Sequence, residues 1–193
     1  MIIILLILCF ILFLLTTIIL FKINKLKNIK YNQPEILSDK KILIAYYSNI
    51  GNTRNVAQNL YSIINGDIEE IQLKEKYPKN IFKMSKIIRK QMKENFLPEI
   101  NNIDVKNYDV IFIGSPIWNF SLSLPLKSFL KNNNFEDKIL IPFFTYSGGA
   151  NTKKIYKEIK ELANAQSIQK PTFFFENGIF LVKERLIAWL NKL

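Results

Sequence analysis

Residues 41–64 read KILIAYYSNIGNTRNVAQNLYSII, and their pattern indicates the fold class. Its first part, Lys41 to Tyr47, is a continuous apolar run, which is typical of a β-strand covered on both faces. A short polar loop follows at Ser48 to Thr53. After it, apolar residues recur at helical spacing, at Val56, Ala57, Leu60, Ile63 and Ile64. The stretch therefore predicts a strand, a tight loop and a helix in succession.

The same alternation continues to the end of the chain. Four more runs predict strands, at Asp67 to Leu73, Tyr108 to Gly114, Lys138 to Phe144 and Pro171 to Phe175. Helical periods follow each of them, at residues 81–92, in a helix opened by Pro125, at Thr152 to Leu162 and at Val182 to Leu193. Crossover helices pack back on the sheet that they connect. We predict an α/β fold, a three-layer sandwich with a five-stranded parallel sheet and helices on both faces, over residues 40–193.

The composition excludes several chemistries. The 193 residues include no His and one Cys, Cys9. A His base, a Ser-His-Asp triad and a His-ligated metal are therefore excluded. Cys9 lies in an apolar N-terminal run, which leaves no soluble Cys nucleophile, disulfide framework or Cys-ligated cluster. Redox chemistry in this chain would require a bound organic cofactor, and we expect no metal site.

The first 21 residues contain no charged side chain. As a helix, such a run is about as long as the hydrocarbon core of a bilayer is thick. A cleaved secretory signal needs basic residues before the apolar run and small residues at a cleavage site, and the sequence has neither. A lipid anchor on Cys9 is disfavoured because Leu6, Ile7 and Leu8 precede it instead of small residues. We therefore predict an uncleaved transmembrane anchor over residues 1–21.

The flanks of this run indicate its orientation. Lys22, Lys25, Lys27 and Lys30 follow it, and nothing basic precedes it. Positive charge stays on the cytoplasmic side, so we expect a single-pass protein of the cell membrane with residues 40–193 in the cytoplasm. Residues 22–39 are expected to form a basic juxtamembrane linker, with irregular backbone at Pro34.

The chain is basic, with a formal net charge of +11. No nucleic-acid motif accompanies this charge, so we expect no nucleic-acid partner. One basic run is dense and contains a single acid, Glu75: its cations are Lys74, Lys76, Lys79, Lys83, Lys86, Arg89, Lys90 and Lys93. Anionic lipid or an acidic partner would suit it, but a solvated helix face is the interpretation we favour.

Three loops follow the strands that begin at Lys41, Tyr108 and Lys138. In an open α/β sheet, ligands bind beyond the carboxyl ends of the strands. The first loop, Ser48 to Thr53, suits an anion, and it suits a simple helix-capping turn equally well. Trp118 in the second loop either offers a flat aromatic face to a ligand or is an ordinary packing residue. Residues 145–151 form a polar Gly-containing loop. Taken together, the three loops predict a pocket for a phosphorylated planar ring.

These motifs resemble the flavodoxin family, in its small bacterial flavodoxin-like branch. Residues 46–53, YYSNIGNT, look like the family's FMN-phosphate signature, and residues 111–118, IFIGSPIW, look like its second flavin loop. The resemblance implies strand order 2-1-3-4-5 and FMN as the cofactor. It also implies cofactor-binding residues, with no side chain assigned a catalytic role. Those for the phosphate are Ser48, Asn49, Ile50, Gly51, Asn52 and Thr53; those along the isoalloxazine are Pro116, Ile117, Trp118 and Asn119; those at its other edge are Thr145, Tyr146, Ser147 and Gly148.

The chain departs from the family pattern at three positions. Ile50 replaces a hydroxyl residue, and Asn119 and Phe120 stand where the branch often has Trp and Gly. Of these two, Asn119 is the residue expected to tolerate positive φ.

The resemblance implies a membrane-tethered FMN protein that performs electron transfer or NAD(P)H/quinone-type oxidoreduction. Its partners would be a redox protein, a nicotinamide cofactor or a quinone. The alternative is a membrane interaction module that has lost flavin binding.

Overall fold

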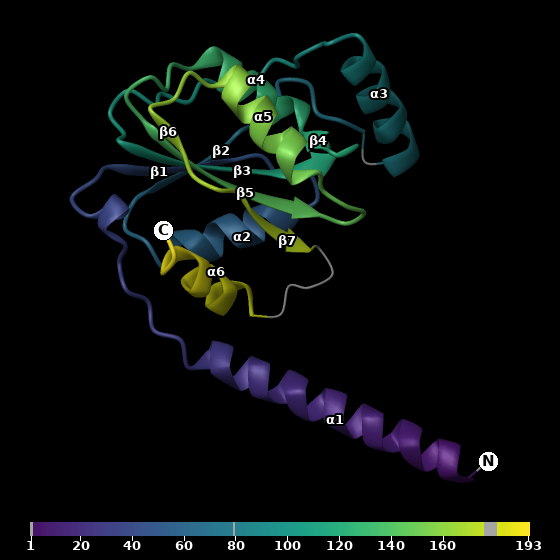
Figure 1. The fold of residues 1–193 in the computed structure, drawn as a ribbon. Helices are drawn as coiled ribbons and strands as arrows, with labels where there is room; N and C mark the ends of the chain where they lie inside the picture. Colours follow the sequence, from purple (N-terminus) through teal and green to yellow (C-terminus); the bar gives the residue numbers. More distant parts are fainter. Residues whose placement is uncertain (1, 79, 176–180) are drawn as a thin grey trace.

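The computed structural model describes residues 2–78, 80–175 and 181–193 (Figure 1). Met1 of the expected anchor and Lys79 of the basic run lie outside these residues. The elements are α1 (Ile2–Lys27), a 3-10 turn η1 (Glu35–Leu37), β1 (Ile42–Tyr46), α2 (Asn52–Tyr61), β2 (Asp67–Glu70), α3 (Ile81–Lys93), β3 (Val110–Trp118), β4 (Ser121–Leu122), α4 (Leu124–Asn132), β5 (Ile139–Tyr146), α5 (Thr152–Leu162), β6 (Ser167–Ile168), β7 (Thr172–Phe175) and α6 (Val182–Leu190).

The central sheet is parallel apart from one short strand. Its order is β2-β1-β3-β5-β6, with β7 paired to the later part of β5 and β4 antiparallel to β3. The predicted order is confirmed, but the predicted count of five strands is wrong, because the sheet has seven. The fifth strand is split into β6 and β7 around Pro171, which has no N–H to donate. The other additional strand is β4, which the sequence did not predict.

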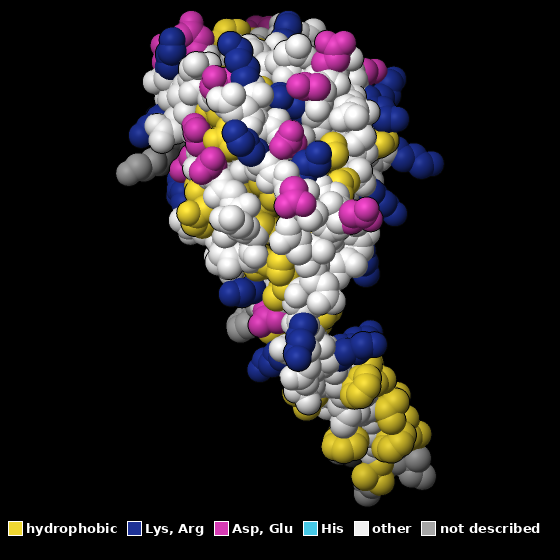
Figure 2. Space-filling model, turned by 90° about the vertical axis from the view of Figure 1, so that its left-hand side faces the viewer, with side chains coloured by type: hydrophobic (Ala, Val, Ile, Leu, Met, Phe, Trp, Pro, Cys, Tyr) yellow, Lys and Arg dark blue, Asp and Glu magenta, His cyan; other side chains and the backbone are white. Residues whose placement is uncertain are grey.

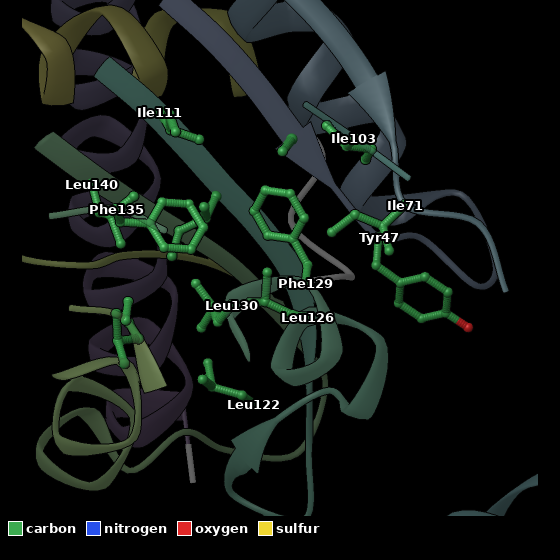
Figure 3. Close-up of a cluster of buried hydrophobic side chains, with 14 of the residues drawn as sticks. Tyr47, Ile71, Ile103, Ile111, Leu122, Leu126, Phe129, Leu130, Phe135 and Leu140 are labelled. Atoms are coloured by element: carbon green, nitrogen blue, oxygen red, sulfur yellow. The ribbon is translucent and has the colours of Figure 1, made fainter. Parts of the chain in front are cut away.

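Helices cover both faces of the sheet, as predicted. On one face, Val56 and Leu60 of α2 and Leu186 of α6 pack against strand residues that include Ile44 and Phe112. On the other face, α4 and α5 pack against the alternate residues of the same strands, and Figure 3 shows part of this cluster, with Phe129 and Leu130 lying between α4 and the sheet. Burying side chains of this size is worth about 1.5–3 kcal/mol each, so the two cores hold the strand ends in place.

The N-terminal helix α1 continues beyond the expected limit at Phe21 to Lys27. Residues 6–27 are long and apolar enough to cross a bilayer, a property that signal sequences share. Figure 2 shows the apolar surface of α1 and the basic side chains where it joins the domain.

The segment after α1 packs on the domain. Leu37 is buried in the α2 and α6 cluster. The backbone N–H of Asn32 donates to Asn191 Oδ1 at 3.0 Å, and Asn191 Nδ2 donates to the Lys30 carbonyl at 2.8 Å. These contacts attach the juxtamembrane segment to the end of α6.

Candidate cofactor site at the carboxyl ends of three strands

The three segments that the sequence singled out meet at one edge of the sheet. β1, β3 and β5 are adjacent and parallel, so their carboxyl ends lie side by side. The Oγ1 atoms of Thr53 and Thr145 are 2.8 Å apart, which joins the first segment to the third. A Cβ on Gly149 would lie 2.9 Å from Cε1 of Phe120, which places the second segment against the third.

The first loop ends in an uncapped helix N-terminus. Gly51 precedes α2 with φ 103°, and no side chain caps the helix. Ser48 Oγ accepts the Gly51 N–H at 3.1 Å, and the first helical bond runs from Asn55 N to the Gly51 carbonyl at 2.9 Å. The N–H groups of residues 52–54 therefore have no intrahelical acceptor. Together with the positive end of the helix dipole, they suit an anion.

Two features keep this end of the helix open. A Cβ on Gly51 would meet no atom within 4 Å, so the approach to the loop is clear. The side chain of Ile50 is 70% exposed. It therefore removes a hydroxyl donor without covering the backbone N–H groups beside it.

Arg54 and Glu70 form a charged pair beside the loop, and no motif in the sequence predicted it. Arg54 Nη2 lies 2.6 Å from Glu70 Oε1, and its Nε donates to Oε2 at 3.2 Å. Hydrogen bonding to Glu70 raises the pKa of Arg54 above its ordinary value. The pair leaves little net charge at this position, so the anion-binding character of the loop comes from the backbone of α2.

The second segment is a β-hairpin, which corrects its expected form as a loop. β3 continues through Pro116, Ile117 and Trp118 and pairs with β4, with Trp118 opposite Ser121. The two turn residues, Asn119 and Phe120, have φ of 48° and 59°. Two-residue hairpins of this kind require positive φ at both positions. The expectation for Asn119 is confirmed, whereas positive φ at Phe120 costs about 1–2 kcal/mol and was not expected.

Trp118 lies between two tyrosine rings. Its ring meets those of Tyr47 and Tyr77 edge-on, with centroids 5.6 Å apart in both pairs. The Tyr77 hydroxyl donates to Gln91 Oε1 at 2.8 Å, and burial raises the pKa of Tyr77 to about 12. Burial also raises the pKa of Tyr47. Both phenols therefore stay neutral, and the indole is held in a fixed orientation.

The third segment begins inside β5, which extends to Tyr146. Thr145 is buried, whereas Ser147 and Gly148 are exposed. The Tyr146 ring packs on Phe173 and Phe175 of β7, with centroids 6.3 and 5.4 Å away. The side chain of Tyr146 is therefore engaged by the sheet edge, and the exposed backbone beyond it is what a ligand can reach.

A pocket of about 630 Å³ opens beside the first loop. Its lining residues come from the loop, the start of α2 and the segment after β2: Tyr47, Ser48, Asn49, Ile50, Arg54, Glu70, Ile71, Gln72, Leu73, Lys76, Tyr77 and Pro78. Trp118 and Thr145 are not among them. Tyr47 and Tyr77, which line this pocket, are also the two residues whose rings contact Trp118.

Helix α3 lies over the same edge of the sheet. Asn49 Nδ2 is 3.0 Å from Met84 Sδ, and Asn119 Nδ2 is 3.6 Å from Met92 Sδ. The first and second segments thus both contact this helix. The sequence predicted α3 but gave no signal for its position, because no local pattern encodes which loop a connecting helix covers.

The site suits a phosphorylated ring better than a metal ion. In the described part of the chain, no group of three or more Cys, Asp or Glu side chains could hold a metal. Free backbone N–H groups at α2 fit an anion, and the hairpin that carries Trp118 and the exposed residues Ser147 and Gly148 follow the neighbouring strands β3 and β5 at the same edge of the sheet. An α/β domain with such a site belongs to the flavodoxin-like class.

The chain belongs to the flavodoxin family, whose family model, described as flavodoxin, matches residues 41–193. A crystal structure of a flavoprotein in complex with FMN from Lactobacillus acidophilus NCFM is 33% identical, with a TM-score of 0.58 over 69% of this chain and 93% of that chain. A structure described as a flavoprotein from Bacteroides eggerthii is 26% identical, with a TM-score of 0.62 over 80% and 98% of the two chains. No curated protein matches the chain.

Proposed function

We propose that this protein binds FMN at the edge formed by β1, β3 and β5 and performs electron transfer or NAD(P)H/quinone-type oxidoreduction while tethered to a membrane by α1. The observation that carries the proposal is the uncapped N-terminus of α2 beside the third segment. The two are joined by the Oγ1 atoms of Thr53 and Thr145, which are 2.8 Å apart. The 33% identical Lactobacillus flavoprotein, which was crystallised with FMN, supports the choice of ligand.

The first loop would hold the phosphate. The N–H groups at the start of α2, that of Thr53 among them, would donate to its oxygens, with Ser48 and Asn52 adding side-chain donors. Asn49, Ile50 and Gly51 would contribute backbone alone, since the Ile50 side chain points to solvent and Gly51 has none. Loss of the hydroxyl at position 50 therefore weakens the cradle without removing it.

The second and third segments would hold the ring. Pro116, Ile117, Trp118 and Asn119 would lie along one side, with Trp118 kept in place by Tyr47 and Tyr77. Thr145, Tyr146, Ser147 and Gly148 would line the other edge, with the Tyr146 side chain turned away toward β7. Bound FMN supplies one-electron or two-electron transfer. The protein binds and orients the ring, and the three segments contain no carboxylate that would oppose negative charge on it.

The membrane part of the proposal rests on α1 and its flanks. An apolar span followed by Lys22, Lys25, Lys27 and Lys30 favours an uncleaved anchor with the domain on the cytoplasmic side. The electron donor and acceptor would be a redox protein, a nicotinamide cofactor or a membrane quinone. The anchor would raise the local concentration of a quinone partner.

A titration of the full chain in detergent with FMN and with riboflavin tests the proposal. We expect FMN to bind at least about 100-fold more tightly, because several hydrogen bonds to a charged phosphate contribute about 1.5–3 kcal/mol each. Gln58→Ala, at an exposed position of α2 outside the loop, serves as the control and should leave the FMN affinity within about twofold. Equal affinity for the two flavins would contradict the proposed phosphate loop. No binding of either flavin would favour a membrane interaction module.

A further inference from the structure

A carboxylate of α5, that of Glu158, accepts hydrogen bonds from β4, the return strand of the hairpin. The Ser121 hydroxyl donates to it, with Oγ 2.7 and 2.9 Å from its two oxygens, and the Leu122 N–H donates to Oε2 at 2.9 Å. Ser121 and Leu122 are buried, and a buried donor at the edge of a sheet is costly when it has no acceptor. Glu158 therefore serves β4 as a neighbouring strand would.

The helix and a lysine hold this carboxylate in place. Ile155 and Ile159, which lie before and after Glu158 in α5, are fully buried in the core beneath α4 and α5. The Nζ atom of Lys127 in α4 lies 3.2 Å from Glu158 Oε1, and the two side chains are only 19% and 16% exposed. Hydrogen bonds to a charged group are stronger than those between neutral groups. Glu158 is therefore a fixed acceptor whose half-buried charge is paired.

The hairpin needs support from outside itself. Its turn residues, Asn119 and Phe120, have φ of 48° and 59°, a conformation that a Phe side chain disfavours. Its second strand contains two residues, and a hairpin so short is not stable alone. The bonds from β4 to Glu158 supply part of the support, because they fix the strand that leaves the turn.

The same hairpin carries residues of the candidate site. Ser121 pairs with Trp118 across the hairpin, so Glu158 bonds to the residue directly opposite the indole-bearing one. Tyr47 and Tyr77 contact the indole ring, whereas Glu158 acts on the backbone and side chain of the strand beside it. Helix α5 begins directly after the third segment. Glu158 therefore joins the second segment to the helix that follows the third.

We propose that Glu158 is a positioning residue of the cofactor site. By holding β4, it fixes the turn at Asn119 and Phe120 and the strand that carries Trp118, and so raises the affinity for the flavin ring. This inference rests on the proposed function for the identity of the ligand. A site binds more tightly when the residues that support it are ordered before the ligand arrives. Because Glu158 acts through β4, binding of the ring depends on it and binding of the phosphate does not.

Titration of the full chain in detergent with FMN and with riboflavin, followed by flavin fluorescence, tests this separation. Glu158→Ala should raise the Kd of both flavins at least about fivefold, because it removes hydrogen bonds to a charged group. The ratio of the two Kd values should stay within about twofold of the wild type, since the phosphate loop is unchanged. Glu158→Gln keeps one acceptor oxygen and should lose less affinity than Glu158→Ala.

Glu161→Ala is the matched control. Glu161 is an exposed acid on the same helix and is paired with Lys157 at 3.5 Å. Its removal makes the same change in net charge, and it should change the Kd of both flavins by less than about twofold. Equal losses in Glu158→Ala and Glu161→Ala would overturn the proposal.

Ser121→Ala separates the hairpin from the ion pair. It removes one donor to Glu158 and leaves Lys127 paired, so it also serves if Glu158→Ala folds poorly. We expect Ser121→Ala to raise the Kd of both flavins at least about threefold, and to add less than about twofold in the Glu158→Ala background, because the two residues act through one contact. Fully additive effects would show that Glu158 acts by another route, and they would overturn the proposal.

Hydrogen exchange without flavin measures the hold on the hairpin directly. In Glu158→Ala, residues 117–123 should exchange at least about tenfold faster, and residues 52–61 of α2 should be unchanged, because the opening is local. Faster exchange in both segments would indicate a general loss of stability. That result, unchanged exchange in the hairpin, or a loss of affinity for FMN alone would overturn the proposal. If the wild type binds neither flavin, faster exchange confined to residues 117–123 would support the hold of Glu158 on the hairpin and refute the proposed function.

Discussion

The bond between Thr53 and Thr145 gives the sharpest test of the site's geometry. Their Oγ1 atoms are 2.8 Å apart, and the residues are 1% and 2% exposed. Thr→Val keeps the shape of the side chain and removes the hydroxyl. Either single variant strands one buried hydroxyl, which costs about 1–3 kcal/mol. The double variant strands neither, so we expect it to lose less than about 1 kcal/mol.

Urea unfolding of the full chain in detergent, without flavin, measures these values. Fluorescence of Trp118 and Trp189 reports the transition, and an unchanged m-value shows that the variants keep the same folded state. We expect the loss of stability in the double variant to be smaller than the sum of the two single losses by at least about 1 kcal/mol. Additive losses would refute the contact between the first and third segments. They would also remove the reason for placing one ligand across both.

Four further predictions follow from the site and the anchor. Trp118→Ala should weaken FMN binding at least about tenfold, measured by flavin fluorescence, since two edge-on pairs worth about 0.5–1.5 kcal/mol each orient the indole; Trp118→Phe should retain more. Because the pKa of Tyr77 is raised from 10.0 to about 12, its contribution to stability is complete below pH 10 and is lost between pH 10 and 12; urea midpoints should fall less steeply over this range in Tyr77→Phe. Gly149→Ala should lower the free energy of unfolding by about 1–3 kcal/mol, since Gly149 has φ of 151° and the new Cβ would meet Phe120 at 2.9 Å; an unchanged urea midpoint would contradict the packing. Protease added to intact cells should leave the domain uncleaved, and protease added after lysis should cleave it. Cleavage in intact cells would contradict the proposed topology.

The elements that could be predicted from the sequence are those with strong local patterns. The run at Lys41 to Tyr47 is apolar on both faces because both faces are covered, and β1 lies at Ile42–Tyr46. The strand order came from a resemblance, since pairing between strands is set by contacts that no single segment contains. The loops met at one edge because parallel strands in neighbouring positions end together.

The parts that could not be predicted depend on long-range contacts or on unusual turn chemistry. The hairpin at Asn119 and Phe120 was missed because Phe carries no preference for positive φ, and the usual signal, a Gly, is absent. Pairing with β4 then extends β3 to Trp118. Tyr77 and Met84 reach the site from a connection whose pattern predicts a helix and nothing about where it packs.

The absorption spectrum of the purified full chain, taken after incubation with FMN and removal of free flavin, shows whether the protein binds FMN. We expect flavin bands that correspond to one FMN per chain, and their loss in Trp118→Ala. A colourless wild-type protein, with all the FMN recovered in the filtrate, would contradict the proposed FMN binding.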